Sequence, residues 1–567
     1  MAFLFGASSK RARLLVLAAA LVLTTLYLGF RIRQDASEFS GGLAGAGTHA
    51  MDIGGDADES EALAAVSKPD ATTPAPAAAP TCLKFEELQR QRPGPASAGK
   101  RKFPLVRPPP GCRTYNLSSL EALLVRMKTV IKDPDLYRLF ENSYPNTLDT
   151  MIKWRGFARQ PASKQASGWG DNHAELGPET DEELTYVITG DIDAMWLRDS
   201  ASQIYSYLPL LEADEDHDSL AGLWRGLINL QARYITISPY CHSFQPPPES
   251  GIKPTTNGAY HQNNPQPPYD PVLVFDCKWE LDSLASFLRV SAAYAQRTGD
   301  LSFFGKYKWQ AAVRAAVDAS AAMQLGTYAD DGKKISDDVP SVATTPITLA
   351  NDAVVPHRDF GDIIAYEVDG FGGANLMDDA NVPSLLSIPL FFNASSAGAK
   401  SSSSSSSPFR AQPRGEKKEQ GTTDGSKQKQ RDYGEIYRNT RKFVLSDANP
   451  YFAKGPVISA VGGPHLGPGK AWPMAALVAG LTAYEPLSGG DNLTAKEVRD
   501  EVAEQLRMVL DSTAGSGVVH ESVNSWEENN WTRSWFGWAN GLFGELVLRI
   551  EEQEKGDADG LLSRSWQ

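Results

Sequence analysis

Acidic, basic and aromatic side chains crowd together in the segment TGDIDAMWLRDSASQIYSYLPLL, which spans Thr189–Leu211. Asp191, Trp196, Arg198 and Asp199 fall within nine residues and directly precede an apolar run with helical spacing. Carboxylates and a guanidinium hydrogen-bond hydroxyl groups, an indole stacks on the apolar side of a sugar ring, and paired carboxyl groups perform acid/base chemistry. The segment therefore predicts a set of hydroxyl-binding groups that line a carbohydrate site, with Trp196 as a wall.

Four further loops share this mixture of carboxylates and aromatic residues, with glycine or proline nearby, and each opens an apolar helical run. They are Phe275–Leu284, Ala365–Leu390, Gly462–Met474 and Val518–Glu545. A structural alternative stays open for single residues, because aspartate at a helix start commonly caps the helix. Asp199, Asp282 and Asp379 are candidate caps, Arg198 beside Asp199 is a candidate ion pair, and the tryptophans are candidate core residues. The recurrence of the mixture in five loops favours a binding site.

Helices must position these loops. Apolar residues recur at three- and four-residue intervals in at least seven stretches, which is the signature of amphipathic helices. Examples are LEALLVRMKTVI, SLAGLWRGLINLQARYI, WELDSLASFLRVSAAYAQ and WFGWANGLFGELVLRIEE. Strand-like alternation is scarce and short, as in LTYVIT. The pattern predicts an all-α domain, an array of helix pairs that could close into a toroid.

Six motifs in order carry a resemblance to a known family. They are GDIDAMWLRDSASQIYSYLPL, KWELDSL, AYEVDGFGGANLMDDANVPSLLSIPL, RNTRKFVLSDANPYF, GGPHLGPGKAWPM and the pair HES and RSWFGWANGLFGELVL. Together they resemble glycoside hydrolase family 125, the exo-acting α-1,6-mannosidases, over roughly residues 113–550. The resemblance implies an (α/α)6 barrel and metal-independent hydrolysis, with inversion at the anomeric carbon, that removes a non-reducing terminal mannose. No cofactor is expected.

The same resemblance implies roles for individual residues. Glu521 in HES matches the general base that activates water, and the neighbouring tryptophans favour a raised carboxyl pKa there. A loop carboxylate held by Arg533 is the structural alternative for Glu521. The other residues expected to contact the sugar are Asp191, Trp196, Arg198, Asp199, Glu280, Asp282, Asp378, Asp379, His465, His520 and Trp535.

The general acid has no clear counterpart. The family carries it in an RPSDD-like motif followed by a long helical stretch, whereas this chain passes quickly from Tyr328 to Tyr366. Asp337 and Asp338 in SDD echo the motif without its arginine and proline, so Asp338 is only a weak candidate. We therefore expect a barrel that lacks part of one or two helix pairs. Two functions stay open, an active α-mannosidase and an inactive mannose-binding protein.

The first residues predict a membrane anchor. Basic residues in the tail 1–13 precede the uncharged run Leu14–Phe30, which is just long enough to span a bilayer. The excess of positive charge before the run predicts a cytosolic N-terminus and a lumenal domain, in the Golgi or the endoplasmic reticulum. A cleaved signal peptide is the rival interpretation. We expect a disordered lumenal stem over 31–112, the hydrolase domain over 113–552 with a disordered insert at 394–432, and a C-terminal tail over 553–567.

Charge and cysteine content bound the partners. The net charge of −14 argues against nucleic acid, since a phosphate-binding surface needs clustered positive charge. The four cysteines allow three pairings, of which Cys82–Cys112 with Cys241–Cys277 is one. Metal binding is the weaker interpretation, because no CxxC or HxxxH spacing occurs. A mannose-containing glycan and the membrane are the expected partners.

Overall fold

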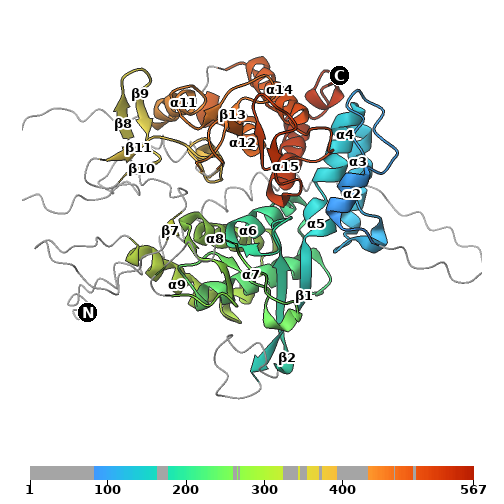
Figure 1. Cartoon of the computed structure of the whole chain (residues 1–567), viewed down its shortest axis with the longest axis vertical. Coiled ribbons are helices and arrows are strands. Elements are labelled where there is room, and N and C mark those ends of the chain that lie inside the picture. Colours follow the sequence, from blue (N-terminus) through green and yellow to red (C-terminus); the bar gives the residue numbers. More distant parts are fainter. Residues whose placement is uncertain are drawn as a thin grey trace, which may run out of the picture.

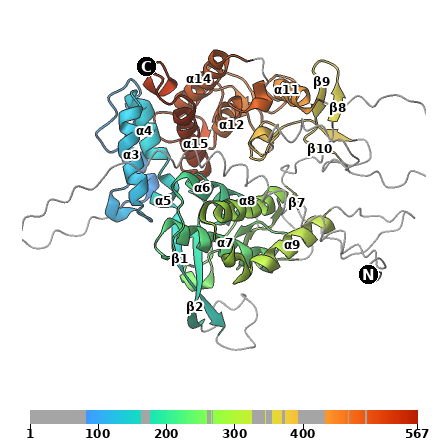
Figure 2. The same ribbon diagram turned by 180° about the vertical axis from the view of Figure 1, so that it is seen from behind.

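The computed structural model describes residues 82–161, 176–258, 265, 268–323, 343–344, 354–368, 373–391, 432–464, 466–489 and 493–566. Helices dominate and form two groups that lie side by side (Figure 1). Helices α6 to α9 make up one group, and α11 to α15 make up the other, with α3 and α4 beside α15. The opposite view shows the same arrangement (Figure 2).

Ten helices of nine or more residues lie within the described ranges, and they confirm the predicted helix-rich domain. They are α3 (Ser118–Val130), α4 (Pro134–Ser143), α6 (Leu197–Tyr205), α7 (Leu220–Ile237), α8 (Leu281–Thr298), α9 (Trp309–Ala322), α11 (Tyr433–Val444), α12 (Pro473–Ala483), α14 (Ala495–Asp511) and α15 (Gly537–Gln553). The shorter ones are α2 (Phe85–Gln91), α5 (Asn146–Thr150), α13 (Pro486–Gly489) and the 3₁₀ turns η1 (Pro110–Cys112), η2 (Leu208–Leu210), η3 (Pro248–Ser250), η5 (Ser302–Gly305), η6 (Ile388–Leu390) and η8 (Leu561–Ser563).

The longer helices form an inner row with outer helices packed behind it. Along the inner row α8 packs against α6, α6 against α15, and α15 against α12. Every residue of α12 is buried, as expected for a helix enclosed on all sides. Helices α7, α14 and α4 cover the row from outside. The segment predicted to be shortened falls between α9 and α11, and most of it lies outside the described residues.

Short strands connect the helix starts, and one long hairpin departs from the all-α prediction. The strands are β1 (Ile152–Pro161), β2 (Leu176–Val187), β3 (Met195–Trp196), β4 (Ser243–Phe244), β5 (Val274–Asp276), β6 (Lys278–Trp279), β7 (Ala343–Thr344), β8 (Val354–His357), β9 (Gly361–Ile364), β10 (Glu367–Val368), β11 (Ala374–Asn375), β12 (Phe452–Ala453), β13 (Ala460–Val461), β14 (Lys470–Ala471), β15 (Ser522–Asn524) and β16 (Trp531–Thr532). The antiparallel pair β1–β2 projects from the helices (Figure 1). Only the inner part of β2 is buried, and it contains Leu184–Val187, the start of the strand-like stretch LTYVIT, whereas the outer part shows no apolar alternation.

The described parts of the predicted stem and tail, 82–112 and 553–566, pack on the domain instead, while 31–81 lie outside the described residues. Within 82–112, Phe103 joins the main core, while Phe85 and Val106 form a smaller cluster with Val518. At the other end, Trp566 is buried and its backbone N–H donates to Asp133 at 2.7 Å. In both segments the buried aromatic and aliphatic residues occur singly among prolines and polar residues. The sequence therefore shows no apolar periodicity there, and its composition predicted a disordered stem and a tail.

Other predictions cannot be compared with the fold. The anchor Leu14–Phe30 and the insert up to residue 431 lie outside the described residues, and Asp432 caps the start of α11 with its side chain. Among the helices that the structure describes, none has the length and apolarity needed to cross a bilayer. The disulfides are Cys82–Cys112 and Cys241–Cys277, one of the three pairings that the sequence allowed.

Candidate functional site

The starts of α6 and α8 bring one arginine together with three acids. Nη1 of Arg198 donates to Oδ2 of Asp282 at 3.2 Å and lies 3.3 Å from Oε2 of Glu280, while Nη2 donates to Oδ2 of Asp199 at 3.1 Å. All four side chains are buried. Burial raises the pKa of Asp282 to about 8 against the opposing charge of Arg198, so this carboxyl holds a proton near neutral pH.

The structure rules out simple capping for the acids of this cluster. The residues in the N-cap positions of α6 and α8 are Trp196 and Glu280, and neither makes a side-chain capping bond. Asp199 and Asp282 lie inside the first turns, where a carboxylate interacts favourably with the helix dipole. Within the described residues Nε of Arg198 is buried without an acceptor, so it can still donate to a hydroxyl group.

His242, which the sequence gave no reason to select, ties the two helix starts together. Its Nδ1 accepts from the backbone N–H of Glu280 at 2.7 Å, and its carbonyl oxygen accepts from the backbone N–H of Leu197 at 3.1 Å. Burial lowers the pKa of His242 to about 4, so the ring is neutral. The disulfide Cys241–Cys277 links the residue before His242 to the segment that leads into α8.

Glu521 lies on the β15–β16 hairpin with both carboxylate oxygens held. Oγ1 of Thr532 donates to Oε2 at 3.0 Å, and Nε of Arg533 lies 3.3 Å from Oε1. Nη1 of Arg533 also donates to Oδ1 of Asp191 at 3.3 Å. Burial raises the pKa of Glu521, while the Arg533 cation lowers it and the carboxylates of Asp191 and Asp199 raise it. Arg533 therefore holds the Glu521 carboxylate, as the structural alternative predicted. This contact is compatible with a role of Glu521 as general base.

The loop before α6 and the loop before α15 are joined directly. Gly190 and Phe536 form an isolated bridge, and the backbone N–H of Asp191 donates to the carbonyl oxygen of Trp535 at 3.2 Å. Gly190 has φ +137°, and a Cβ there would lie 1.9 Å from the Trp535 oxygen, so only glycine fits. The Asp199 carboxylate raises the pKa of Glu521 and the Arg533 cation lowers that of Asp199, so the base candidate and the Arg198 cluster lie close together.

The two neighbouring aspartates of the MDDAN motif have different environments. Asp378 accepts from the backbone N–H groups of Leu385 and Leu386 at 2.9 and 3.3 Å, so it organises its own loop. Oδ1 of Asp379 accepts from both nitrogens of Asn381, at 2.9 Å from the backbone and 2.7 Å from the side chain, but within the described ranges Oδ2 is buried without a donor. Burial raises the pKa of Asp378 to about 7 and that of Asp379 to about 6.

Tyr366 is a second residue that was not selected from the sequence. Its hydroxyl is buried and, within the described residues, has no hydrogen-bond partner. Burial raises its pKa, and the charges of Asp379, Asp378 and Asp282 add to the shift, which places Tyr366 beside both acidic groups. Asp379 and Tyr366 thus offer an acceptor and a donor for hydroxyl groups next to Arg198, whose charge lowers the pKa of Asp379.

The remaining predicted residues are less directly placed for binding a sugar. Both ring nitrogens of His520 face backbone carbonyl oxygens, those of Thr513 at 3.1 Å and Arg533 at 3.3 Å, and burial lowers its pKa to about 4. The indole N–H of Trp535 donates to Thr150 at 3.0 Å, and its ring packs towards α2. These two side chains support the loop. His465, Asp337 and Asp338 lie outside the described residues.

Two tryptophans lie near Arg198. Trp538 contacts it in space, and Trp196 precedes it by two positions in the sequence. The guanidinium carbon of Arg198 lies 5.3 Å from the centre of the Trp538 ring, a cation–π contact. Trp196 is half-buried and packs edge-on against Phe275 with ring centres 5.4 Å apart. Trp538 was hidden in the sequence because it sits within an apolar helix.

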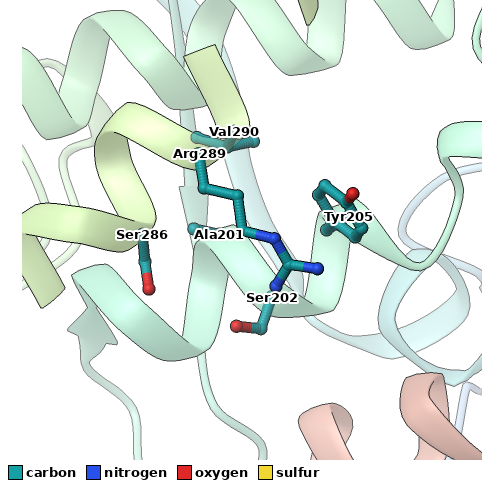
Figure 3. Close-up of a pocket in the computed structure, with 6 residues that line it drawn as sticks. All are labelled: Ala201, Ser202, Tyr205, Ser286, Arg289 and Val290. Atoms are coloured by element: carbon teal, nitrogen blue, oxygen red, sulfur yellow. The ribbon is translucent and has the colours of Figure 1, made fainter. Parts of the chain in front are cut away.

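A small hollow lies deeper along the same faces of α6 and α8 (Figure 3). Its lining residues are Ala201, Ser202, Tyr205, Ser286, Arg289 and Val290. Ser202 and Ser286 each follow a residue of the Arg198–Asp282 pair by four positions, one helical turn away. The Arg289 guanidinium points between Ser202 and Tyr205, and its carbon lies 3.8 Å from the centre of the Tyr205 ring. The hollow therefore lies one helical turn beyond the acidic cluster, and Arg289 is among the residues that line it.

Comparisons with known proteins identify the family to which the chain belongs. The family profile described as metal-independent alpha-mannosidase (GH125) matches residues 133–340 and 341–548. The Meiotically up-regulated gene 157 protein of Schizosaccharomyces pombe is 33% identical over 551 residues, covering 83% of this chain and 93% of that protein.

A solved structure from Streptococcus pneumoniae, in a study of metal-independent alpha mannosidases, shares the fold with a TM-score of 0.50. It is 22% identical, the match covers 77% of this chain and 99% of that chain, and it holds α-1,6-mannobiose in a non-productive complex. The family resemblance predicted from the motifs is confirmed. With its helix-rich (α/α)6 fold and these matches, the chain belongs to glycoside hydrolase family 125, the metal-independent α-mannosidases.

Proposed function

We propose that the chain is an exo-acting, inverting α-1,6-mannosidase that removes non-reducing terminal mannose from glycans or mannoproteins. The observation that carries this proposal is the proximity of Glu521 to the Arg198 cluster. Glu521 would act as general base on the attacking water, and Arg198 and Asp379 would hold mannose hydroxyl groups. The α-1,6-mannobiose in the Streptococcus pneumoniae structure supports the choice of linkage.

Glu521 has the environment that a general base requires. Burial brings its pKa towards the working pH, while Arg533 keeps the charged form accessible. Thr532 fixes one oxygen through its hydroxyl group, and the other lies beside Arg533. A base that must activate water on one face of the sugar needs this fixed orientation.

A second function is favoured by the missing acid segment, namely mannose binding without hydrolysis. The two stretches of the family profile meet between residues 340 and 341, where the sequence predicted the shortened segment. The alignment with the Schizosaccharomyces pombe relative spans 551 residues but only 83% of this chain, so that relative has a stretch without a counterpart here. Loss of general-acid help slows leaving-group departure by roughly 10²–10⁴-fold.

Hydrolysis of α-1,6-mannobiose separates the two functions. We expect release of mannose that continues in a chelator and is abolished by Glu521→Gln. Glu527→Gln is the matched control, since Glu527 is an exposed carboxyl on the same hairpin. Saturable binding of mannobiose without release, by wild type and Glu521→Gln alike, would support the binding protein. If the protein neither binds α-1,6-mannobiose nor releases mannose from it, both proposals are wrong.

We further propose that the chain is a single-pass type II membrane protein of the Golgi or endoplasmic reticulum, anchored by Leu14–Phe30. Two disulfides support a lumenal domain, since such bonds persist in oxidising compartments. Protease protection of intact microsomes tests the topology. Digestion of the domain without added detergent would contradict it.

A further inference from the structure

Two exposed tryptophans lie on the hairpin that carries Glu521. Among the large apolar side chains exposed in the described residues, the two aromatic ones are Trp526, with 71% of its surface accessible, and Trp531, with 36%. Both follow Glu521 by ten residues or fewer. Exposed indole rings are costly to leave in water, so their concentration beside a candidate base indicates a contact surface.

The tip of the hairpin presents Trp526 on a fixed backbone. Oδ1 of Asn524 accepts from the backbone N–H groups of Trp526 at 2.9 Å and Glu527 at 3.2 Å. The backbone N–H of Ser525 donates to the carbonyl oxygen of Gly469 at 3.0 Å, and Ser525 in turn accepts from Val457. An ordered turn that displays an unpacked indole loses little conformational entropy when a ligand stacks on it.

Trp531 is held from one side only. Its ring stacks on His520 with centres 4.3 Å apart and planes within 1°. The neutral imidazole covers one face of the indole, and the partial exposure of the side chain leaves surface open to solvent. The register of the hairpin pairs Trp531 with Val523, and the next pair, Thr532 with Ser522, adjoins Glu521.

We propose that Trp526, supported by Trp531, forms a stacking platform for neutral sugar residues of the glycan beyond the bond to be cleaved. Trp526 lies five positions after Glu521, which along an extended hairpin is at most about 17 Å. A terminal mannose at Glu521 leaves the tip within reach of the inner residues of a long or branched glycan. A disaccharide is too short to fill both positions.

The charges around the platform favour an uncharged ligand. Glu527 and Glu528 are exposed next to Trp526, and Lys470 on the neighbouring strand donates to Asn530 at 2.8 Å. Two carboxylates beside the indole would repel a phosphorylated or sulfated glycan. Hexose residues stack their apolar face on an aromatic ring without needing charge. This inference rests on the proposed α-mannosidase function and adds the substrate class, an extended neutral oligomannose.

The test compares substrate lengths with the full-length protein. We expect Trp526→Ala to raise the KM for a branched oligomannose glycan about 3- to 10-fold. Trp526→Phe, which keeps an aromatic ring, should bring the KM most of the way back to the wild-type value. The KM for α-1,6-mannobiose should stay unchanged. Leu301→Ala is the control, since Leu301 is 66% exposed and belongs to another element, the loop between α8 and η5.

The outcomes separate this inference from the function on which it rests. Equal KM values for oligomannose in wild type and Trp526→Ala, with mannobiose still cleaved, would overturn the platform alone. If wild type cleaves neither substrate, the proposed hydrolysis fails, and quenching of tryptophan fluorescence by oligomannose in Glu521→Gln still tests the platform. Loss of a dimer in Trp526→Ala by light scattering, without a change in KM, would assign the surface to a second copy of the chain instead.

Discussion

Replacing Arg533 should change the pH dependence of the reaction in a defined direction. Nε of Arg533 lies 3.3 Å from Oε1 of Glu521, and at an effective dielectric constant of about 20 that separation corresponds to about 5 kcal/mol. Arg533 is shared with Asp191 and is partly exposed, so the net effect on Glu521 is far smaller than this figure. Because the Arg533 cation lowers the pKa of Glu521, Arg533→Met should raise it.

The pKa of a general base sets the acidic limb of the pH profile of kcat/KM. We expect Arg533→Met to move this limb upwards, and Arg533→Lys to move it less because the charge remains. Asp191→Asn should move it downwards, since the Asp191 carboxylate raises the pKa of Glu521. Initial rates on α-1,6-mannobiose across pH 3–8 give the three profiles.

The test is strict because the acidic limb should move in opposite directions in Arg533→Met and Asp191→Asn. Identical acidic limbs in wild type and Arg533→Met would show that Glu521 is not the titrating base. A downward shift in Arg533→Met would contradict the electrostatic argument itself.

Three further predictions concern stability. Gly190→Ala should destabilise the fold by about 2–4 kcal/mol, since its Cβ would meet the carbonyl oxygen of Trp535 at 1.9 Å, whereas Gly251→Ala, with φ +66° and open space, should cost about 1 kcal/mol; urea unfolding compares them. Arg198→Met should cost about 3–5 kcal/mol by leaving buried acids without their cation, and a midpoint equal to wild type would refute this. Thermal stability should fall from pH 6.5 to 8, because the folded chain keeps a proton on Asp282 up to about pH 8 that the unfolded chain has already released; a rising midpoint would contradict it.

The sequence by itself determined which chemistry was present and which segments carried it. Carboxylates, arginine and tryptophan at the starts of periodic apolar runs predicted a carbohydrate site on a helical scaffold, and the motif order predicted the family that the comparisons confirm. These features are local, because composition and spacing within ten to twenty residues reveal helix starts and their side chains. Arg198, Asp199 and Asp282 could be selected in this way, and the fold brings them together.

Only the tertiary structure decided which of the selected residues meet and which support the others. Arg533 reaches Asp191 and His242 reaches Glu280 across distances of the chain that no local pattern records, and Trp538 faces Arg198 from within an apolar helix. The side chains of Asp378 and His520, in contrast, hydrogen-bond to backbone groups of their own loops. The physical reason is that the hydrogen-bond partners and the burial of a side chain depend on its neighbours in space. These neighbours come from helix starts that lie far apart in the sequence.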